Sequence, residues 1–225
     1  MKKTILLGIA LSAILFSCET KTEEVVDETP VVEAVEEVAE VVTGVQYTVN
    51  TEESAIHWKG AKVLDPTYGH YGTIKLSSGE VTLGEGNVIL GGSIIADMNT
   101  IEALDLAEDV EKKGMLEGHL KGAAEENKDH FFNVSEHPTA SFEITSVEGS
   151  VVKGNFTIKG ITNEEEFEAT VMEEDGKLIA KTSEFKIDRV KYKVEYGSAT
   201  SFVDLAKDKV ISDDIMLEIS LVLTK

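Results

Sequence analysis

The chain has 225 residues, only one of them cysteine, and a formal net charge of −21. Such an excess of acidic side chains, with no basic stripe, excludes electrostatic binding to nucleic acid and argues against docking by charge on anionic lipid. The lone cysteine excludes an intramolecular disulfide, so the fold must be stabilised by its hydrophobic core.

Residues 1–18, MKKTILLGIALSAILFSC, are typical of a secretory signal peptide, with two lysines before an apolar run. The run is too short to span a bilayer. Residues 15–18, LFSC, resemble a bacterial lipobox, which implies that Cys18 is lipidated and becomes the first residue of the mature protein. Ordinary cleavage with a free Cys18 and an uncleaved anchor are the alternatives. We therefore expect an exported lipoprotein in the periplasm or on the outer membrane or surface of a Gram-negative bacterium.

Residues 19–44 contain nine acidic residues, one lysine and no aromatic side chain. This composition buries too little area to offset the entropy of ordering, so we interpret the segment as an acidic, flexible tether. A short amphipathic helix over residues 31–42 is the alternative, because Val32, Val35 and Val38 would share one face.

Residues 45–225 form one domain of predominantly period-two pattern. Ile56 and Trp58 alternate with His57 and Lys59, and Val88, Leu90, Ile94, Ala96 and Met98 form a second alternating series. Similar runs recur to the end of the chain, separated by expected turns at residues 77–80, 84–87 and 173–177. The pattern predicts about eight or nine antiparallel strands, and hence a mainly β sandwich or closed barrel.

One helical insertion is predicted at residues 104–122. Leu106, Val110, Met115 and Leu116 recur near a period of 3.6 and are expected to share a buried face. Gly114 weakens the middle of this segment, so two short helices are expected.

His119, His130 and His137 lie close together in the sequence and raise the question of a metal site. Their spacing lacks the HExxH pattern or another convergent arrangement of zinc ligands. We interpret them as exposed histidines or as part of a corner that Pro138 ends. His57 is expected to point outward. No GxSxG element or nucleophile with an identifiable base is present, so no catalysis, metal or cofactor is predicted.

Aromatic side chains fall on the apolar faces of several predicted strands. They either fill an ordinary core or line a cavity, and the period of the pattern does not separate these alternatives.

Three stretches resemble the YceI-like family of lipid-binding, polyisoprenoid-binding proteins. They are Phe131-Phe132 with Pro138 and Phe142, the run GNFTIKGIT at residues 154–162, and Asp188-Arg189. The resemblance implies an extended, lipocalin-like antiparallel barrel that holds a long-chain lipid and has no shared catalytic or metal site. The residues expected to line its interior are Trp58, Ile94, Phe142, Phe156, Phe167, Phe185 and Leu217.

Arg189 would bind a lipid headgroup or pair with an acidic side chain. Two positions depart from the family. His130 stands at a usually small or acidic position, which reopens a polar or metal role, and Lys193 replaces a common glycine, which puts the local turn in question.

The leading hypothesis is a non-catalytic carrier of a polyisoprenoid or similar amphiphile, held at the membrane by an acyl chain on Cys18. The first alternative is a structural or stress-related surface lipoprotein whose barrel is filled by its own side chains. A hydrolase or metalloenzyme comes third, and a homodimer remains open.

Overall fold

The computed structural model describes residues 43–225. The predicted signal peptide, Cys18 and almost all of the predicted tether lie outside the described residues. The described segment contains every strand of a closed sheet together with its hydrophobic core.

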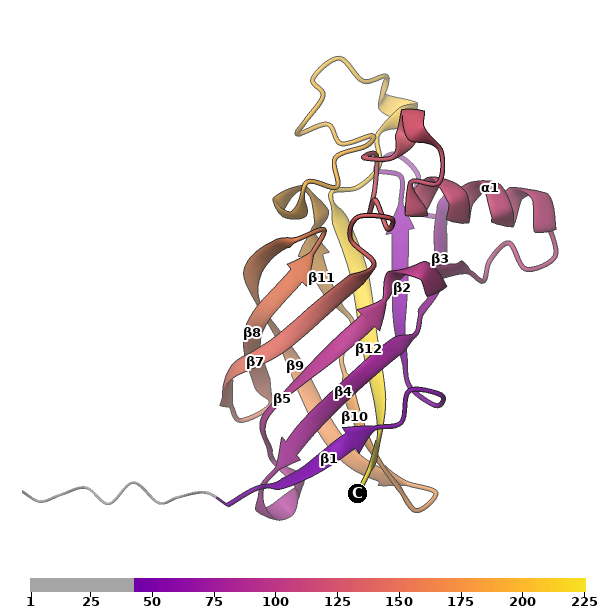
Figure 1. Cartoon of the computed structure of the whole chain (residues 1–225). Coiled ribbons are helices and arrows are strands. Elements are labelled where there is room, and N and C mark those ends of the chain that lie inside the picture. Colours follow the sequence, from indigo (N-terminus) through magenta and orange to yellow (C-terminus); the bar gives the residue numbers. More distant parts are fainter. Residues whose placement is uncertain (1–42) are drawn as a thin grey trace, which may run out of the picture. The chain divides into compact units, whose positions relative to one another are not determined.

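Eight long antiparallel strands close into a barrel, which confirms the predicted mainly β, barrel-type fold (Figure 1). Three of the long strands are bent and consist of two labelled halves each: β1 with β2, β3 with β4, and β10 with β11. In the first hairpin, β1 pairs with β4 and β2 pairs with β3. Both β10 and β11 pair with β12. The strands are β1 (Val45–Val49), β2 (Ala55–Ala61), β3 (Gly69–Ile74), β4 (Leu76–Leu83), β5 (Ile89–Asp97), β6 (Glu102–Ala103), β7 (Thr139–Glu148), β8 (Val151–Ile158), β9 (Ile161–Glu174), β10 (Lys177–Thr182), β11 (Phe185–Asp188) and β12 (Asp214–Thr224).

The last strand closes the barrel. One edge of β12 pairs with β10 and β11, and its other edge pairs with β2 and β1. Each successive long strand otherwise pairs with the next one along the chain, so the topology is a simple meander.

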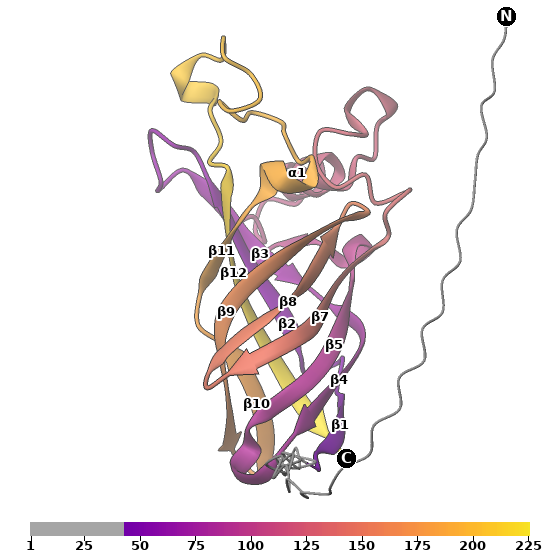
Figure 2. The same ribbon diagram turned by 90° about the vertical axis from the view of Figure 1, so that its left-hand side faces the viewer.

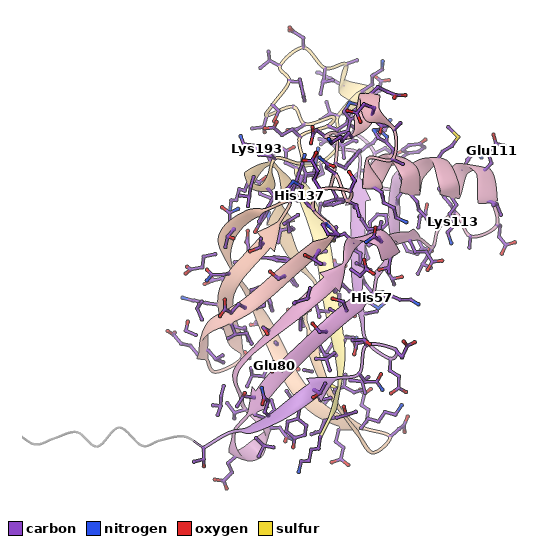
Figure 3. The ribbon with its side chains drawn as sticks, in the orientation of Figure 1. His57, Glu80, Glu111, Lys113, His137 and Lys193 are labelled. Carbon is purple, nitrogen blue, oxygen red and sulfur yellow. The ribbon has the colours of Figure 1, made fainter. Side chains whose placement is uncertain are left out.

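Irregular segments gather at one end of the barrel, here called the α1 end. It carries helix α1 (Val110–Lys121), residues 122–138 and residues 189–213 (Figures 1 and 2). The short 3₁₀ helices η3 (Glu125–Asn127), η4 (Arg189–Tyr192) and η5 (Lys207–Lys209) belong to these segments, while η1 (Glu85–Asn87) and η2 (Met98–Thr100) flank β5. Figure 3 shows His137 and Lys193 at the α1 end and Glu80 toward the other end.

Two of the three expected turns are confirmed. Residues 84–87 contain η1, and Asp175-Gly176 joins β9 to β10 with positive φ at both residues. This is the twist that a two-residue hairpin needs. The expected turn at residues 77–80 is wrong: the segment lies inside β4, where pairing with β1 and β5 outweighs its turn-forming composition.

A bulge changes the alternation predicted for residues 88–98. The register of β4 with β5 shifts so that Leu90 is an extra residue between the partners of Thr82 and Leu83. Ile94 and Ala96 are buried as expected, but Val88 is exposed. An extra residue moves one part of a strand to the opposite face, which a period count does not detect.

The helical insertion forms one helix, not two. Asp109 caps its start, Gly122 ends it in a left-handed conformation, and Gly114 lies within it. The predicted buried face is wrong for Val110 and Met115, which are 80% and 70% exposed. Leu120 is the buried residue of α1, and Leu116 packs against the core while partly exposed. Lys113 pairs with Glu102 of β6, and Glu117 accepts from the N–H of Ala103, so the second half of the helix contacts the barrel while its start projects away (Figure 1).

Residues 129–138 form the predicted corner between α1 and β7. Asn133 is buried with a positive φ, and its carbonyl accepts hydrogen bonds from the backbone N–H groups of Glu136 and His137. Its side-chain amide donates to Asp129, 2.9 Å away. His137 lies against the β8–β9 turn, near Gly160.

The first glycine of the GNFTIKGIT run is required by packing. A Cβ added at Gly154 would lie 2.5 Å from Cζ of Phe142, whose ring covers this position, and would also meet the carbonyl oxygen of Glu143. The bare backbone of β8 therefore lets a large aromatic ring fill the barrel.

We expect Gly154→Ala to lower the free energy of unfolding by about 1–3 kcal/mol, because Phe142 must leave its rotamer or the strands must separate. Gly114→Ala is the matched control: its added Cβ meets nothing within 4 Å. It should raise helix stability by roughly 1 kcal/mol. Urea unfolding of both variants measures the two effects, and equal effects would contradict this account of Gly154.

Candidate functional site

Two apolar cavities lie in the interior of the barrel formed by residues 43–225. The larger has a volume of about 110 Å³ and the smaller about 50 Å³. On β12 the first is lined by Ile215, Leu217 and Ile219 and the second by Ile219 and Leu221, so the cavities follow one another along the strand. They share Ile94, Phe142 and Ile219 as a common wall.

The side chains that line the larger cavity come from the strands and from the α1 end. They are Ile56, Trp58, Gly60, Ile74, Ile94, Ala96, Met98, Ile101, Leu120, Phe131, Phe132, Ala140, Ser141, Phe142, Phe156, Ile158, Ile187, Arg189, Ile211, Ser212, Ile215, Leu217 and Ile219.

Six of the seven residues expected to line the interior lie on a cavity. Trp58, Ile94, Phe142, Phe156 and Leu217 line the larger one, and Phe167 lines the smaller. Phe185 is not among the lining residues of either cavity. It is buried and stacks on Phe167 with ring centroids 4.3 Å apart.

A row of phenylalanine rings crosses the interior between the cavities. Phe156 and Phe142 are partners on β8 and β7, with centroids 5.8 Å apart. Phe142 lies 4.9 Å from Phe167, which continues the row to Phe185. Such contacts stabilise the fold beyond area burial alone. Four of the seven residues expected to line the interior thus form this packed row of rings.

Trp58 brings a polar atom to the wall of the larger cavity. Its ring lies among apolar side chains of the lining, and its indole Nε1 is buried with no hydrogen-bond partner within residues 43–225. A buried N–H without an acceptor is costly.

Arg189 is buried at the α1 end and holds the chain together there. Its Nε donates to the carbonyl of Ser212 at 2.8 Å, Nη1 to that of Val194 at 2.6 Å, and Nη2 to that of Ile211 at 3.3 Å. The carboxylate of Asp213 lies 3.6 Å away. The protein's own carbonyl groups therefore occupy the guanidinium. Of the two roles expected for Arg189, pairing with an acidic side chain agrees better with the structure than binding a lipid headgroup.

The rest of this motif is structural in the same way. The Asp188 carboxylate accepts from the N–H of Val190, and the Tyr192 hydroxyl, fully buried, donates to Glu165. Lys193 follows with φ of 58°. Glycine adopts this left-handed conformation without strain, whereas a residue with a Cβ does not. The glycine common in the family therefore suits this position, and Lys193 occupies it at a cost in backbone strain.

His119 and His130 form a hydrogen-bonded pair, with Nε2 and Nδ1 2.8 Å apart. Tyr196 stacks on His130 at 4.5 Å, and Phe131 packs edge-on against His119 at 5.1 Å. This cluster joins α1 to residues 189–213 above the larger cavity, whose wall includes Phe131. The histidines are half-buried corner residues, as interpreted from their spacing, although they point to one another.

Within the described residues 43–225, no three His, Cys, Asp or Glu side chains converge as metal ligands. His137 lies apart, beside Gly160, and His57 is exposed on β2. In the same part of the chain, no helix has the length and apolar character needed to cross a membrane.

Sequence reasoning missed several lining residues for two reasons. Ile56, Ile158 and Ile219 share a strand face with predicted residues, so the same alternation would have identified them. Leu120 lies in α1, four residues after Leu116, so the helical period would have identified it. Phe131, Phe132 and Ile211 come from irregular segments, where no period indicates which side chain turns inward. Phe131 and Phe132, which carry part of the family resemblance, lie in the corner and form cavity wall as well.

We expect Arg189→Met to lower the free energy of unfolding by on the order of 3 kcal/mol, since three buried carbonyls lose their donor. Urea unfolding measures this loss. A variant as stable as the parent would contradict the structural role of Arg189.

A second prediction concerns pH. Burial, and to a smaller extent His130, lower the pKa of His119 below its ordinary value of 6.5. The neutral imidazole is favoured in the fold, so this stability is present above pH 6.5 and is lost as the pH falls through the lowered pKa. We expect the melting temperature to drop between pH 7.5 and pH 5, and His119→Phe to reduce that drop. His57→Phe, at an exposed position, should leave it unchanged. An identical drop in all three proteins would contradict this role.

Solved structures provide the comparison for the fold. The crystal structure of BcnA from Burkholderia cenocepacia matches with a TM-score of 0.56 and 18% identity, over 78% of this chain and 99% of that one. A polyisoprenoid-binding domain from Saccharophagus degradans, implicated in plant cell wall breakdown, matches with a TM-score of 0.51 and 14% identity, over 79% of this chain and 97% of that one. At these identities the likeness shows a shared fold.

A comparison with curated proteins finds no match. The family described as the YceI-like domain matches residues 47–223, which is nearly the whole barrel. The match agrees with the resemblance carried by Phe131-Phe132, the GNFTIKGIT run and Asp188-Arg189. The chain therefore belongs to the YceI-like domain family.

Proposed function

We propose that this protein binds a long-chain apolar lipid, a polyisoprenoid or a similar amphiphile, inside its barrel without catalysing a reaction. The apolar cavity of about 110 Å³ at the α1 end is the observation that carries the proposal. Its wall consists mainly of aliphatic and aromatic side chains, and the buried Arg189 is engaged by backbone carbonyls. That chemistry suits the binding of a hydrocarbon.

The neighbour from Saccharophagus degradans supports the ligand class, because it is described as a polyisoprenoid-binding domain and shares the fold. Burial of apolar area would drive binding. An isoprenoid tail that hides several hundred Å² gains about 25 cal/mol per Å², or on the order of 10 kcal/mol before the costs of ordering and association.

The size of the cavity sets a condition on this binding. An apolar cavity of about 150 Å³ in another protein accommodates benzene. A void of about 110 Å³ therefore receives only part of a long chain unless side chains move. We propose that Phe131 and Phe132 move aside, because they lie on an irregular segment, whereas the strand residues are held by the barrel.

We further propose that the barrel is exported and anchored to a membrane by lipidation of Cys18, with residues 19–44 as the tether. The signal-like residues 1–18 and the lipobox-like LFSC stretch support this. Labelling with a radioactive fatty acid in a bacterial host tests it: the parent chain should incorporate label, and Cys18→Ala should not. Equal labelling of both chains would contradict the anchor.

Native mass spectrometry of residues 43–225, purified from a bacterial host, tests the lipid-binding proposal. We expect a stoichiometric apolar adduct that organic solvent removes, and a higher melting temperature when the lipid is present. A clean apo mass that stays unchanged after incubation with polyprenyl lipids would contradict the proposal and favour the alternative of a barrel filled by its own side chains.

Two matched variants locate the ligand. Ala140 lines only the larger cavity and Ala180 only the smaller, and both are at least nine-tenths buried. Ala140→Phe should fill the larger cavity and reduce adduct occupancy at least tenfold. Ala180→Phe should reduce it much less. Each substitution is expected to cost about 1–3 kcal/mol of stability, so circular dichroism must show both variants folded. Equal loss in the two variants would contradict a site in the larger cavity.

A further inference from the structure

Two neighbouring connections at the α1 end expose large apolar side chains. Val63, Leu64 and Tyr68, between β2 and β3, are 55%, 62% and 62% exposed, and Phe202 and Val203, between η4 and β12, are 51% and 89% exposed. These five residues are called the apolar collar here. Scattered apolar side chains are ordinary on a surface, but a cluster on adjoining loops indicates a contact site.

The two connections are joined to each other by their backbones. The N–H of Val63 donates to the carbonyl of Val210 at 3.1 Å, and the N–H of Ser212 donates to that of Ala61 at 2.9 Å. Lys62 and Ile211 form an isolated β-bridge. Figure 2 shows the purple β2–β3 connection and the yellow segment before β12 projecting beyond the barrel at the same end.

The collar adjoins the larger cavity. Gly60, Ile211 and Ser212 line that cavity, and they lie at the bases of the same two connections. The two connections that carry the collar therefore begin at the wall of this cavity.

The charge of the collar differs from that of the whole chain. Residues 62–68 and 199–211 together contain three lysines and three aspartates, in a chain whose net charge is −21. Lys62 lies over the ring of Tyr68, 5.0 Å from its centroid, and also donates to the carbonyl of Asp208. Tyrosine and lysine, with an apolar body and a polar tip, are suited to the boundary between hydrocarbon and water.

We propose that the apolar collar inserts into the interfacial region of a lipid bilayer and brings the cavity to the membrane from which its ligand comes. The proposal rests on the proposed lipid-binding function. The two connections add no net charge at the point of contact, so insertion there depends on apolar area. A second protein or a second copy of the chain is the competing occupant.

Flotation of residues 43–225 with neutral phosphatidylcholine vesicles tests the collar, because this segment contains the whole barrel and lacks Cys18. We expect the protein to float with the vesicles at low salt and equally at about 0.5 M salt, since apolar insertion is not screened. The double variant L64D/V203D should reduce the floated fraction at least tenfold.

The matched control is V45D/V88D. Val45 and Val88 are each 49% exposed and lie at or beside β1 and η1, away from the α1 end (Figure 1). This variant adds the same charge, and it should float as the parent does. Equal loss in both double variants would overturn the proposal, because general acidity would then explain the effect.

Native mass spectrometry of the same samples separates this proposal from the one on which it rests. A parent that carries lipid but does not float overturns the collar and leaves lipid binding intact. Flotation that depends on the collar, in a protein without a lipid adduct, supports the collar and contradicts lipid binding. Analytical ultracentrifugation tests whether a second copy of the chain binds the collar instead. A dimer that L64D/V203D dissociates, in a parent that does not float, would overturn membrane insertion in favour of a second copy.

Discussion

Closure of the sheet by β12 is the constraint on which the rest of the structure depends. Its two edges pair with different parts of the chain, β10 and β11 on one side and β2 and β1 on the other, so the barrel has no free long edge. Closure fixes which side chains face inward, because successive residues of a strand alternate between the two faces. The apolar interior is a direct result of this pairing.

The α1 end of the barrel is covered by packed segments that lie outside the long strands. At the α1 end, Arg189 ties three carbonyls together, and the His119–His130 pair links α1 to Tyr196. These contacts hold Phe131 and its neighbours over the larger cavity. Toward the middle of the barrel, the row of phenylalanine rings from Phe156 to Phe185 fills the space between the strands. The same interior is thus a rigid core in one part and a cavity in another.

The strands and much of the cavity wall could be predicted from alternation, because Trp58, Phe156 and Leu217 each lie on a regular inward face. Alternation failed at Leu90, where a bulge adds one residue, and at residues 77–80, where pairing on both sides outweighs turn composition. The burial of Phe185 was foreseen, but its separation from the cavities depends on the neighbouring Phe167 ring. Ile211 lines the cavity from an irregular segment that a β-bridge to Lys62 holds in place. A pattern of neighbouring residues in the sequence does not reveal such a long-range contact.

The chain enters the barrel through β1, whose start lies at the end opposite α1 (Figure 1). If Cys18 anchors the chain as proposed, residues 19–44 span at most roughly 85 Å when fully extended. The eleven residues of β12 rise about 37 Å along their strand at the usual 3.3–3.4 Å per residue. The extended length of residues 19–44 is therefore more than twice the length of β12. With such an anchor, the α1 end of the barrel could face either the membrane that holds Cys18 or an opposing membrane. If the proposed anchor holds, the length of the tether, which no contact within the barrel determines, would set which membranes the protein can reach.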